Sequence, residues 1–246
     1  YTYNIKTDDY QLIPTEINKD YYISDILEGD DNNIWILTSK SLGRYNKNSK
    51  SYKKVLDLNT ELAANKSLTK IRLHDDILFI ASTSGVIAYN IQKNIWRKLP
   101  EMSNTQITSA NFNANEASKT YSLRLTEQKI LYVGTHDGFF QINVAGIDQY
   151  IEHKKSLPQY KLLIENVSLW HDFIDEDKLY LATDKGLYSL DTKTNKAEFL
   201  FGFSDYFDNI TNDNIVSILK DKNDVFWLAS NANGVYRWDP KRELIT

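Results

Sequence analysis

The sequence predicts an all-β fold made of repeated four-stranded antiparallel units, and three observations lead to this prediction. An aromatic residue is followed three positions later by a hydroxyl residue, and then by a glycine three or four positions further on; this frame recurs along the chain. An Asn or Asp closes each repeat, at positions 46, 90, 143, 191 and 239. No segment has the periodicity of an amphipathic helix, and residues 58–65 could form one turn at most. Self-similarity at such a period is the signature of a repeat architecture.

The composition supports a folded domain and excludes several classes of function. Of the 246 residues, 41% are hydrophobic and 25% are charged, which is enough apolar surface for a core. The net charge is −4 with both signs interspersed, so the sequence argues against binding to nucleic acid or to an anionic membrane surface. Cysteine is absent, which excludes disulfides, thiolate metal sites and a cysteine nucleophile. No apolar run approaches the roughly 18 residues of a membrane span.

The spacing of the closing Asn or Asp sets the boundaries of the repeats. Counting from Asn4, the column advances by 42, 44, 53, 48 and 48 residues, an average of 47, which suits four short strands with their turns. We therefore expect units over residues 1–17 (partial), 18–60, 61–103, 104–160, 161–206 and 207–246. The partial unit should contain only its third strand, at residues 1–4, and its fourth, at residues 10–14.

Each full unit reads as four strands, which we name a to d in chain order. Strand a follows an Ile-x-x-Ile pattern and is expected at residues 23–26, 68–71, 107–110, 167–170 and 215–218. Strand b is a nearly continuous apolar run, typical of a strand buried on both faces, and carries the aromatic anchor: Trp35, Phe79, Tyr132, Tyr180 or Trp227. Strand c follows a glycine, which is Gly85, Gly138, Gly186 or Gly234. Strand d is more polar, as at residues 51–56 and 197–201, and a polar outer strand protects the sheet edge.

Two departures from the pattern stand out. Ser41 replaces the glycine of the first full unit, so its b–c turn should differ from the others. In the third unit, 22 residues separate Ala110 from the anchor Tyr132, against 8 to 10 elsewhere. The additional residues near 113–128 are either a tolerated surface loop or a flap that docks a neighbouring domain.

A four-stranded unit that repeats at about 47 residues is typical of a β-propeller blade, in which radial packing buries both faces of each sheet. The residue pattern of the repeat also resembles that of a known family. Residues 215–239 closely resemble the repeat of two-component regulator propellers, and residues 22–46 and 179–191 repeat the same pattern. Trp238-Asp239 is the dipeptide of WD40 repeats, the nearest rival, but it occurs once and no unit has Gly-His.

The resemblance implies a function and a setting. Such propellers form the periplasmic sensor part of hybrid histidine kinases, are followed by an immunoglobulin-like domain and a membrane helix, and often sense oligosaccharides. It implies that this chain is a non-catalytic, ligand-sensing propeller without cofactor or metal. Its partners would be an oligosaccharide and the adjacent propeller and immunoglobulin-like domains, and a homodimer is compatible with it. Between a closed five-bladed ring and an arc of a larger, for example seven-bladed, ring, we favour the arc.

In a propeller, the b–c and d–a loops surround the central channel on one face, where ligands commonly bind. The candidate ligand-binding residues there offer hydrogen bonds and charges of both signs, as a polyhydroxylated or anionic sugar requires. They are Lys40, His136, Asp137, Trp170, Lys185, Asn231 and Asn233. The alternative for each is an ordinary polar turn residue, since turns are polar whether or not they bind a ligand.

Two of these candidates allow further interpretations. Trp170 stands where the other repeats, in this alignment, carry Ile, Ile, Ala and Ile, so it either fills core volume or stacks on a sugar from the channel wall. His136-Asp137 could be a base with its carboxylate or half of a metal site, although none of the usual zinc-binding spacings occurs. Two other functions remain open: a lyase-type propeller enzyme that uses His136 or His171 at the channel mouth, and a protein-interaction scaffold.

Overall fold

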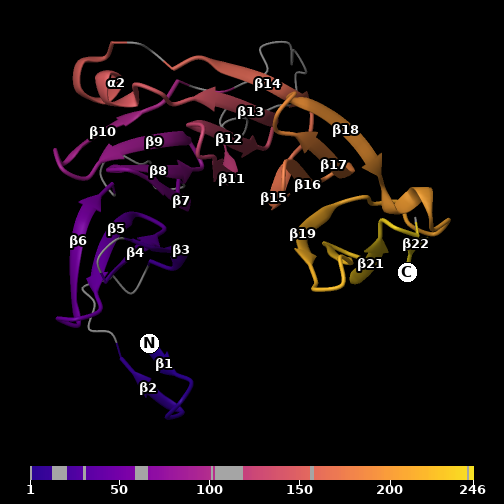
Figure 1. The fold of residues 1–246 in the computed structure, drawn as a ribbon, viewed down its shortest axis with the longest axis horizontal. Helices are drawn as coiled ribbons and strands as arrows, with labels where there is room; N and C mark the ends of the chain where they lie inside the picture. The colour runs from indigo at the N-terminus through magenta and orange to yellow at the C-terminus, as the bar shows by residue number, and fades with distance from the viewer. Residues whose placement is uncertain are drawn as a thin grey trace.

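The computed structural model describes residues 2–12, 21–29, 32–58, 66–100, 102, 119–155, 158–242 and 244–246. These residues form five four-stranded antiparallel sheets and one two-stranded hairpin. Figure 1 shows the sheets standing side by side in an arc, with the hairpin apart from them near the N-terminus. The all-β prediction and the arc of propeller blades are therefore confirmed. We number the five full sheets blades 1 to 5 in chain order.

Each blade consists of four consecutive strands. Blade 1 contains β3 (Ile23–Glu28), β4 (Asn33–Thr38), β5 (Ser41–Asn46) and β6 (Ser51–Asp57). Blade 2 contains β7 (Leu68–His74), β8 (Ile77–Ser82), β9 (Gly85–Asn90) and β10 (Ile95–Lys98). Blade 3 contains β11 (Thr120–Leu125), β12 (Ile130–Thr135), β13 (Gly138–Asn143) and β14 (Tyr160–Glu165). Blade 4 contains β15 (Leu169–Asp175), β16 (Lys178–Thr183), β17 (Gly186–Asp191) and β18 (Lys196–Phe201). Blade 5 contains β19 (Ile215–Lys220), β20 (Phe226–Ser230), β21 (Val235–Asp239) and β22 (Leu244–Ile245).

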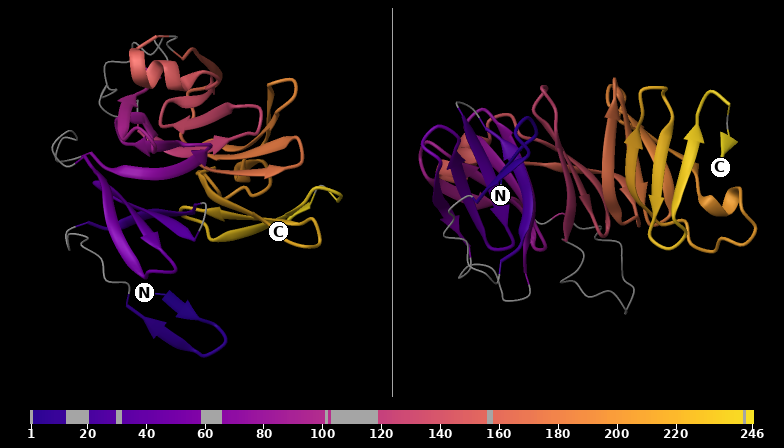
Figure 2. Two further views of the ribbon diagram at one scale, coloured as in Figure 1. Left: turned by 60° about the vertical axis from the view of Figure 1, so that its left-hand side comes forward. Right: turned by 90° about the horizontal axis from the view of Figure 1, so that it is seen from below.

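Strand a lies on the inner side of the arc and strand d of blades 1 to 4 on its outer side (Figure 1). Because every neighbouring pair is antiparallel, the a–b and c–d turns emerge on one face of the arc and the b–c turns on the other. Seen from the side, the strands cross the thickness of the arc between these two faces (Figure 2). We call the second face the b–c face.

The N-terminal hairpin consists of β1 (Thr2–Asn4) and β2 (Asp9–Gln11), paired in register from Thr2–Gln11 to Asn4–Asp9. The two strands lie where the sequence analysis expects strands c and d of the partial unit, although the second begins one residue earlier than expected. Tyr3 and Tyr10 stack across the hairpin with ring centroids 4.8 Å apart, and both rings remain largely exposed.

The position of strand a was predicted wrongly in two units. In blade 3, strand a is β11, and residues 107–110 lie outside the described residues. Because β11 pairs directly with β12, the additional residues precede strand a rather than separate it from strand b. In blade 4, β15 begins at Leu169, two residues later than expected, because Leu169 is the residue that pairs with the end of β16.

The structure also contains helical segments that the sequence analysis did not expect. Helix α2 (Ile147–His153) lies in the c–d connection of blade 3, and a single 3-10 turn, η1, spans Phe203–Asp205. In α2, Ile147 and Ile151 are one turn apart and bury one face of the helix in the core. No helix among the described residues is long and apolar enough to cross a membrane.

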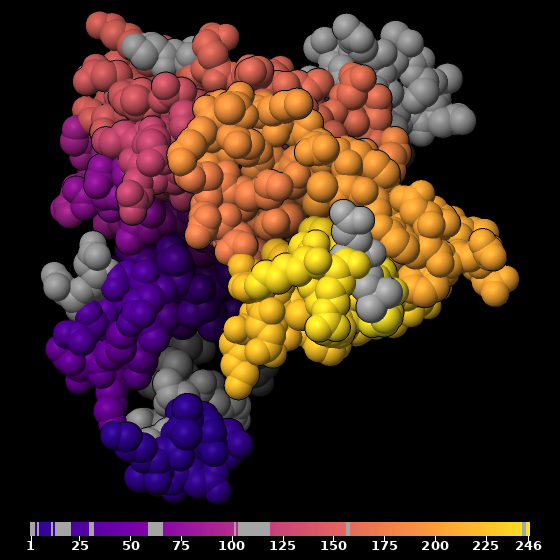
Figure 3. Space-filling model, turned by 45° about the vertical axis from the view of Figure 1, so that its right-hand side comes forward, coloured from indigo at the N-terminus to yellow at the C-terminus, as the bar shows by residue number. Residues whose placement is uncertain are grey.

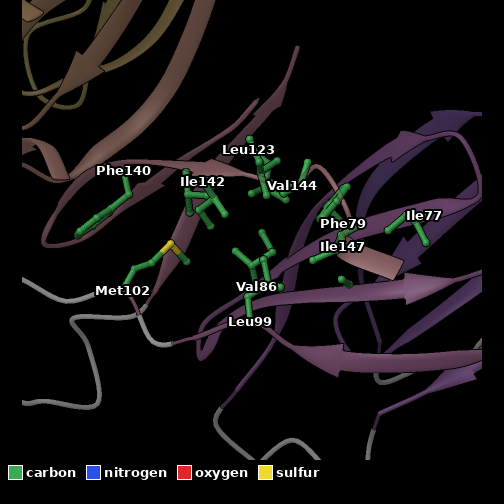
Figure 4. Packing of buried hydrophobic residues seen from close by; sticks show 14 of the residues in the cluster. Ile77, Phe79, Val86, Leu99, Met102, Leu123, Phe140, Ile142, Val144 and Ile147 are labelled. Atoms are coloured by element: carbon green, nitrogen blue, oxygen red, sulfur yellow. The ribbon is translucent and has the colours of Figure 1, made fainter. Parts of the chain in front are cut away.

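Apolar packing between consecutive blades forms the core. Each of the first four anchors packs against the blade that follows, and their exposed fractions are 4% for Trp35, 0% for Phe79, 2% for Tyr132 and 9% for Tyr180. Figure 4 shows the junction of blades 2 and 3, where Phe79 and Val86 lie opposite side chains such as Leu123, Phe140 and Ile142. Blades 4 and 5 pack together in the same way (Figure 3).

Trp227, the anchor of blade 5, is the exception to this burial. It is 39% exposed, and its indole Nε1 donates a hydrogen bond to Asp221 Oδ2 at 3.1 Å. Among the described residues no blade follows blade 5, so the indole has no apolar sheet to pack against. The aromatic of strand b is thus a junction residue, whose burial depends on the next blade.

The hydroxyl of the repeated frame closes the b–c turn. Thr183 Oγ1 donates to the carbonyl oxygen of Gly186 at 2.7 Å and accepts the Lys185 N–H at 3.1 Å. Thr135 bonds Gly138 and Asp137 in the same way, and Ser82 bonds Gly85 and Ser84. The constant spacing from hydroxyl to glycine in the sequence therefore arises from a turn that the hydroxyl side chain caps.

The glycines of the frame supply a backbone conformation that other residues adopt at a cost. Gly85, Gly186 and Gly234 have φ values of +108°, +111° and +85°. At Gly186 a Cβ atom would also overlap the carbonyl oxygen of Phe201. Ser41 has no positive φ; its hydroxyl instead lies 2.8 Å from Thr38 Oγ1, so this turn differs from the others as predicted.

The closing Asn or Asp caps the c–d hairpin. Asp191 Oδ1 accepts the backbone N–H groups of Lys193 at 2.9 Å and Thr194 at 2.8 Å. Asn46 Oδ1 likewise accepts the N–H groups of Asn48 and Ser49. Such Asx turns are a standard use of these residues, and they explain the closing Asn or Asp of the repeat.

The anchors give the first test of this architecture. We expect Phe79→Ala to lower the free energy of unfolding by about 3 to 5 kcal/mol, because it opens a cavity in a closed junction. Trp227→Ala should cost only about 1 to 2 kcal/mol, because the indole is already part-exposed. Urea unfolding followed by circular dichroism measures both. Equal costs would show that the following blade does not hold the anchor.

The turn cap gives the second test. Thr183→Val should lower the free energy of unfolding by about 1 to 3 kcal/mol, because it leaves a buried carbonyl and a backbone N–H without their partner. Thr183→Ser should retain most of the stability. Thr192→Val removes an exposed hydroxyl bond to Asp177 and serves as the control, with an expected effect within about 0.5 kcal/mol. If Thr183→Val matched this control, the hydroxyl would not cap the turn.

Candidate functional site

A β-bulge interrupts strand a at the same place in every blade. The second residue of the strand is left unpaired while strand b continues, so two residues oppose one. The bulged residues are Ser24, Thr69, Tyr121, Trp170 and Val216. Because the start of strand a pairs with the end of strand b, all of them lie at the b–c face, on the innermost strand. A bulge re-aims its side chain, so this position is suited to carry a site.

At the junction of blades 3 and 4, the bulges bring together three rings, which we call the aromatic cluster: Tyr121, His136 and Trp170. The Tyr121 and Trp170 ring centroids are 4.8 Å apart at an interplanar angle of 47°. His136, in the b–c turn of blade 3, meets Tyr121 edge-on at 6.5 Å. All three side chains are half-buried. Two residues predicted from the sequence, His136 and Trp170, thus belong to one site, and Tyr121 links them.

Hydrogen bonds hold the imidazole of His136 in place. Its Nδ1 lies 2.7 Å from Ser168 Oγ, and this hydroxyl also lies 3.1 Å from the His136 carbonyl oxygen. Ser168 is itself fixed, because its N–H donates to Asp184 Oδ1 at 2.7 Å. This hydrogen bond joins the b–c turn of blade 3 to the residue that precedes β15 of blade 4, so the orientation of the ring depends on how the two blades pack.

The indole of Trp170 has an unused donor. Its Nε1 is shielded from water and makes no hydrogen bond to any residue that the structure describes. A buried indole N–H usually has a partner, so this orphaned donor distinguishes the Trp170 position from that of an ordinary core tryptophan. The sequence-based alignment of Trp170 with Ile26, Ile71 and Ile218 is wrong. Its structural equivalents are Ser24, Thr69, Tyr121 and Val216.

The remaining predicted ligand residues do not join the cluster. Lys40 is buried and its Nζ donates to the carbonyl oxygen of Lys66, while Asp137 is only 2% exposed. Neither side chain is presented to the b–c face as a free charge. Lys185, Asn231 and Asn233 are exposed on the b–c turns of blades 4 and 5.

Tyr121 and Ser168 were not predicted from the sequence. A usable signal was present: each bulged residue precedes the aromatic anchor of its own blade by 10 or 11 positions. Counting back from Tyr132 reaches Tyr121, but the strand a assigned to residues 107–110 concealed this alignment.

His171 has a structural role. Its Nδ1 accepts the N–H of Ile218 on β19 at 3.2 Å. Asp25 makes the equivalent contact from blade 1, accepting the Ile71 N–H at 3.1 Å. Both side chains bind the inner edge of the next blade. With Nδ1 occupied as an acceptor, the neutral ring carries its proton on Nε2, so the geometry gives no support to a base at the channel mouth.

Two other kinds of site have less support in the structure. Within the described part of the chain, no group of three His, Cys, Asp or Glu side chains could hold a metal ion. A cavity of about 650 Å³ lies between blades 3 and 4 on the face opposite the b–c face and is lined by residues such as Tyr132, Glu176 and Lys193. Three of its lining charges are already paired, Lys193 with Asp177 at 2.5 Å and Arg124 with Asp172. The aromatic cluster is therefore the better candidate.

Comparison with known proteins establishes the fold. No protein-family model and no curated protein sequence matches the chain. Among solved structures, it is similar to the extracellular domain assigned to the hybrid two-component system BT3049 of B. thetaiotaomicron, with a TM-score of 0.60 and 14% identity over 92% of this chain and 29% of that one. It is also similar to PorZ, a surface component of the type-IX secretion system of Porphyromonas gingivalis, with a TM-score of 0.65 and 16% identity over 96% of this chain and 33% of that one.

A third similar structure comes from the nidogen/laminin complex, with a TM-score of 0.56 and 10% identity over 88% of this chain and 75% of that one. The three proteins differ in their described roles, so the shared fold alone does not determine the function of this chain. This chain spans about a third of the length of the BT3049 and PorZ chains.

The buried histidine gives a pH-dependent prediction. Burial lowers the pKa of His171 below its ordinary value of 6.5, and the neighbouring Asp172 carboxylate opposes this only in part. The unfolded chain therefore binds this proton more readily than the folded chain, so stability is full above about pH 6.5 and falls as the pH drops below it.

We expect His171→Asn to lose less stability than the wild type between pH 7 and pH 5 in urea unfolding, because its Oδ1 can accept the Ile218 N–H without titrating. His153→Asn is the control, because His153 is an exposed side chain at the end of α2. If His171→Asn and His153→Asn followed the same pH dependence, the folded protein would not hold His171 neutral.

Proposed function

We propose that this chain is part of a non-catalytic, extracytoplasmic sensing propeller of a two-component signalling protein, and that it binds an oligosaccharide at the b–c face. A periplasmic location would follow. The observation that carries the proposal is the aromatic cluster, in which the bulges of two adjacent blades hold Tyr121 and Trp170 side by side beside His136.

The chemistry of the cluster suits a sugar. The apolar face of a pyranose ring packs on an aromatic side chain, while its hydroxyl groups need donors and acceptors around the ring. The His136 ring supplies nitrogen atoms beside the aromatic surface, and the exposed Lys185 lies on the neighbouring b–c turn. A neutral or anionic oligosaccharide satisfies these groups better than an apolar ligand would.

Two further features support a sensing role over catalysis. The repeat resembles that of two-component regulator propellers, and an extracellular two-component domain is among the proteins of similar fold. His171 bonds the next blade, so it is not available as a base. A sensor needs only a difference in ligand affinity between two arrangements of its parts. A site that spans two blades can provide this difference, because blade rotation changes its geometry.

The test is isothermal titration calorimetry against defined neutral and uronic-acid-containing oligosaccharides, using the whole chain. We expect binding to at least one of them, and Trp170→Ala should weaken it at least about 30-fold, as expected for a buried aromatic contact. Tyr121→Ala should also weaken it. Phe199→Ala changes an exposed aromatic on the outer strand of the same blade and is the matched control.

The outcomes separate the parts of the proposal. Binding that survives Trp170→Ala would move the site away from the cluster while leaving sensing in place. The absence of binding to every oligosaccharide would contradict the proposed ligand class. Hydrolysis or elimination products that accumulate on incubation with the wild type, and vanish in His136→Ala, would favour an enzyme instead.

A further inference from the structure

Cavities lie at the first three junctions between blades, each close to a turn that joins strand c to strand d. Side chains of both charges line the cavities at the second and third junctions. At the first junction, a cavity of about 300 Å³ lies between the strands of blade 1 and the c–d turn of blade 2, and its described lining residues include no Asp or Glu. The charged residues that line it are Arg44, Lys53 and Lys54, and we call it the basic groove.

Two of these three cations have no carboxylate partner. Lys54 Nζ pairs with Asp57 Oδ2 at 2.7 Å, whereas Arg44 and Lys53 form no ion pair with any residue that the structure describes. The Arg44 guanidinium instead lies over the Trp35 ring, 5.8 Å from its centroid. Arg44 is the cross-strand partner of Trp35 on one side and of Lys53 on the other. The two unpaired cations therefore stand side by side on one face of the sheet, where like charges repel each other.

The other blades do not repeat this arrangement. The comparable pair consists of the strand c residue opposite the anchor and the strand d residue opposite that one. These pairs are Ala88 with Arg97 in blade 2, Gln141 with Lys161 in blade 3, Ser189 with Glu198 in blade 4 and Arg237 with Thr246 in blade 5. None of them joins two cations, so the packing of the repeat does not require such a pair. Protection of the sheet edge explains a lysine on strand d, but Arg44 lies on strand c, inside the sheet, and is partly buried.

Asn94, in the c–d turn of blade 2, adds a neutral donor to the groove. Its Oδ1 accepts the hydroxyl of Tyr89 at 2.9 Å. Tyr89 is only 1% exposed, so this bond fixes the exposed Asn94 amide from the core side and leaves the N–H groups of its Nδ2 for another acceptor. The polar side chains that line the groove thus offer N–H groups from two adjacent blades and no negatively charged acceptor.

We propose that the basic groove binds a phosphate group, with Arg44 and Lys53 as its charged contacts and Asn94 as a neutral donor. The planar fork of a guanidinium matches two phosphate oxygens, and an ammonium adds a point charge. A doubly charged group compensates both unpaired cations, whereas a carboxylate compensates only one of them. The volume suits a small ligand, either inorganic phosphate or the phosphate monoester of a small molecule. The groove lies at the junction of blades 1 and 2, so it is separate from the aromatic cluster and from the oligosaccharide proposed there.

Isothermal titration calorimetry of the whole chain with sodium phosphate, at about pH 8 and constant ionic strength, tests this proposal. The wild type should bind one phosphate per chain with a dissociation constant of about 1 mM or lower. Arg44→Gln and Lys53→Gln should each weaken binding at least about tenfold, because each removes a charge-assisted hydrogen bond. Lys161→Gln is the matched control and should leave binding unchanged, because Lys161 has the position of Lys53 in blade 3 but faces the neutral Gln141.

Parallel titrations with glucose 1-phosphate and with acetate identify the ligand. Glucose 1-phosphate bound at least as tightly as inorganic phosphate would identify a monoester, and weaker binding would identify the free ion. Acetate bound as tightly as phosphate would overturn the proposal.

Three other results would also overturn it: a wild type without saturable binding up to about 20 mM phosphate, unchanged binding in Lys53→Gln, or an equal loss in Lys161→Gln and Lys53→Gln. Circular dichroism checks folding. Lys53 is exposed, so Lys53→Gln keeps the test valid if Arg44→Gln is unstable.

Discussion

The apolar junction between consecutive blades is the interaction on which the rest of this structure depends. A sheet of four short strands with two apolar faces cannot bury both of them alone, so each blade is stable only against its neighbours. The anchors show this dependence: Phe79 is fully buried because blade 3 covers it, whereas Trp227 remains exposed at the end of the arc. A change in the packing of one junction is therefore transmitted to the strands on both sides of it.

Polar contacts along the inner strands fix how one blade is positioned against the next. Strand a has an edge toward the centre of the arc, and its backbone groups need partners. Side chains of the adjoining blade supply some of them: Asp25 and His171 accept N–H groups of the next strand a, and Thr69 Oγ1 donates to the Thr120 carbonyl oxygen at 2.7 Å. These bonds fix the register of one blade against the next. Rings on two bulges of adjacent strands, such as Tyr121 and Trp170, are consequently held at a defined distance.

The fold could be read from the sequence because its signals are local. The hydroxyl of Thr183, the positive φ of Gly186 and the cap of Asp191 each act within a few residues, so they recur at a constant spacing and identify each blade. Strand a lacks a turn cap of this kind and is marked only by its Ile-x-x-Ile pattern, and it was misplaced in blades 3 and 4. Helix α2 was missed because its stability comes from burying Ile147 and Ile151 in the junction of blades 2 and 3, and not from its own short sequence. The candidate site was half predicted for the same reason: His136 belongs to a recognisable turn, whereas Tyr121 depends on the pairing of β11.

A repeat architecture also changes how a site can be recognised. The frame dictates that every blade has a bulge on its inner strand, so the bulge itself distinguishes no blade from another. What differs is the side chain that the bulge presents: Ser24, Thr69 and Val216 are small, whereas Tyr121 and Trp170 are large and lie at one junction. Packing of the repeat does not require two aromatics there, since three other blades form the same bulge without them. Departure from the repeat, at a position that the repeat leaves structurally free, is the physical reason to place function at the junction of blades 3 and 4.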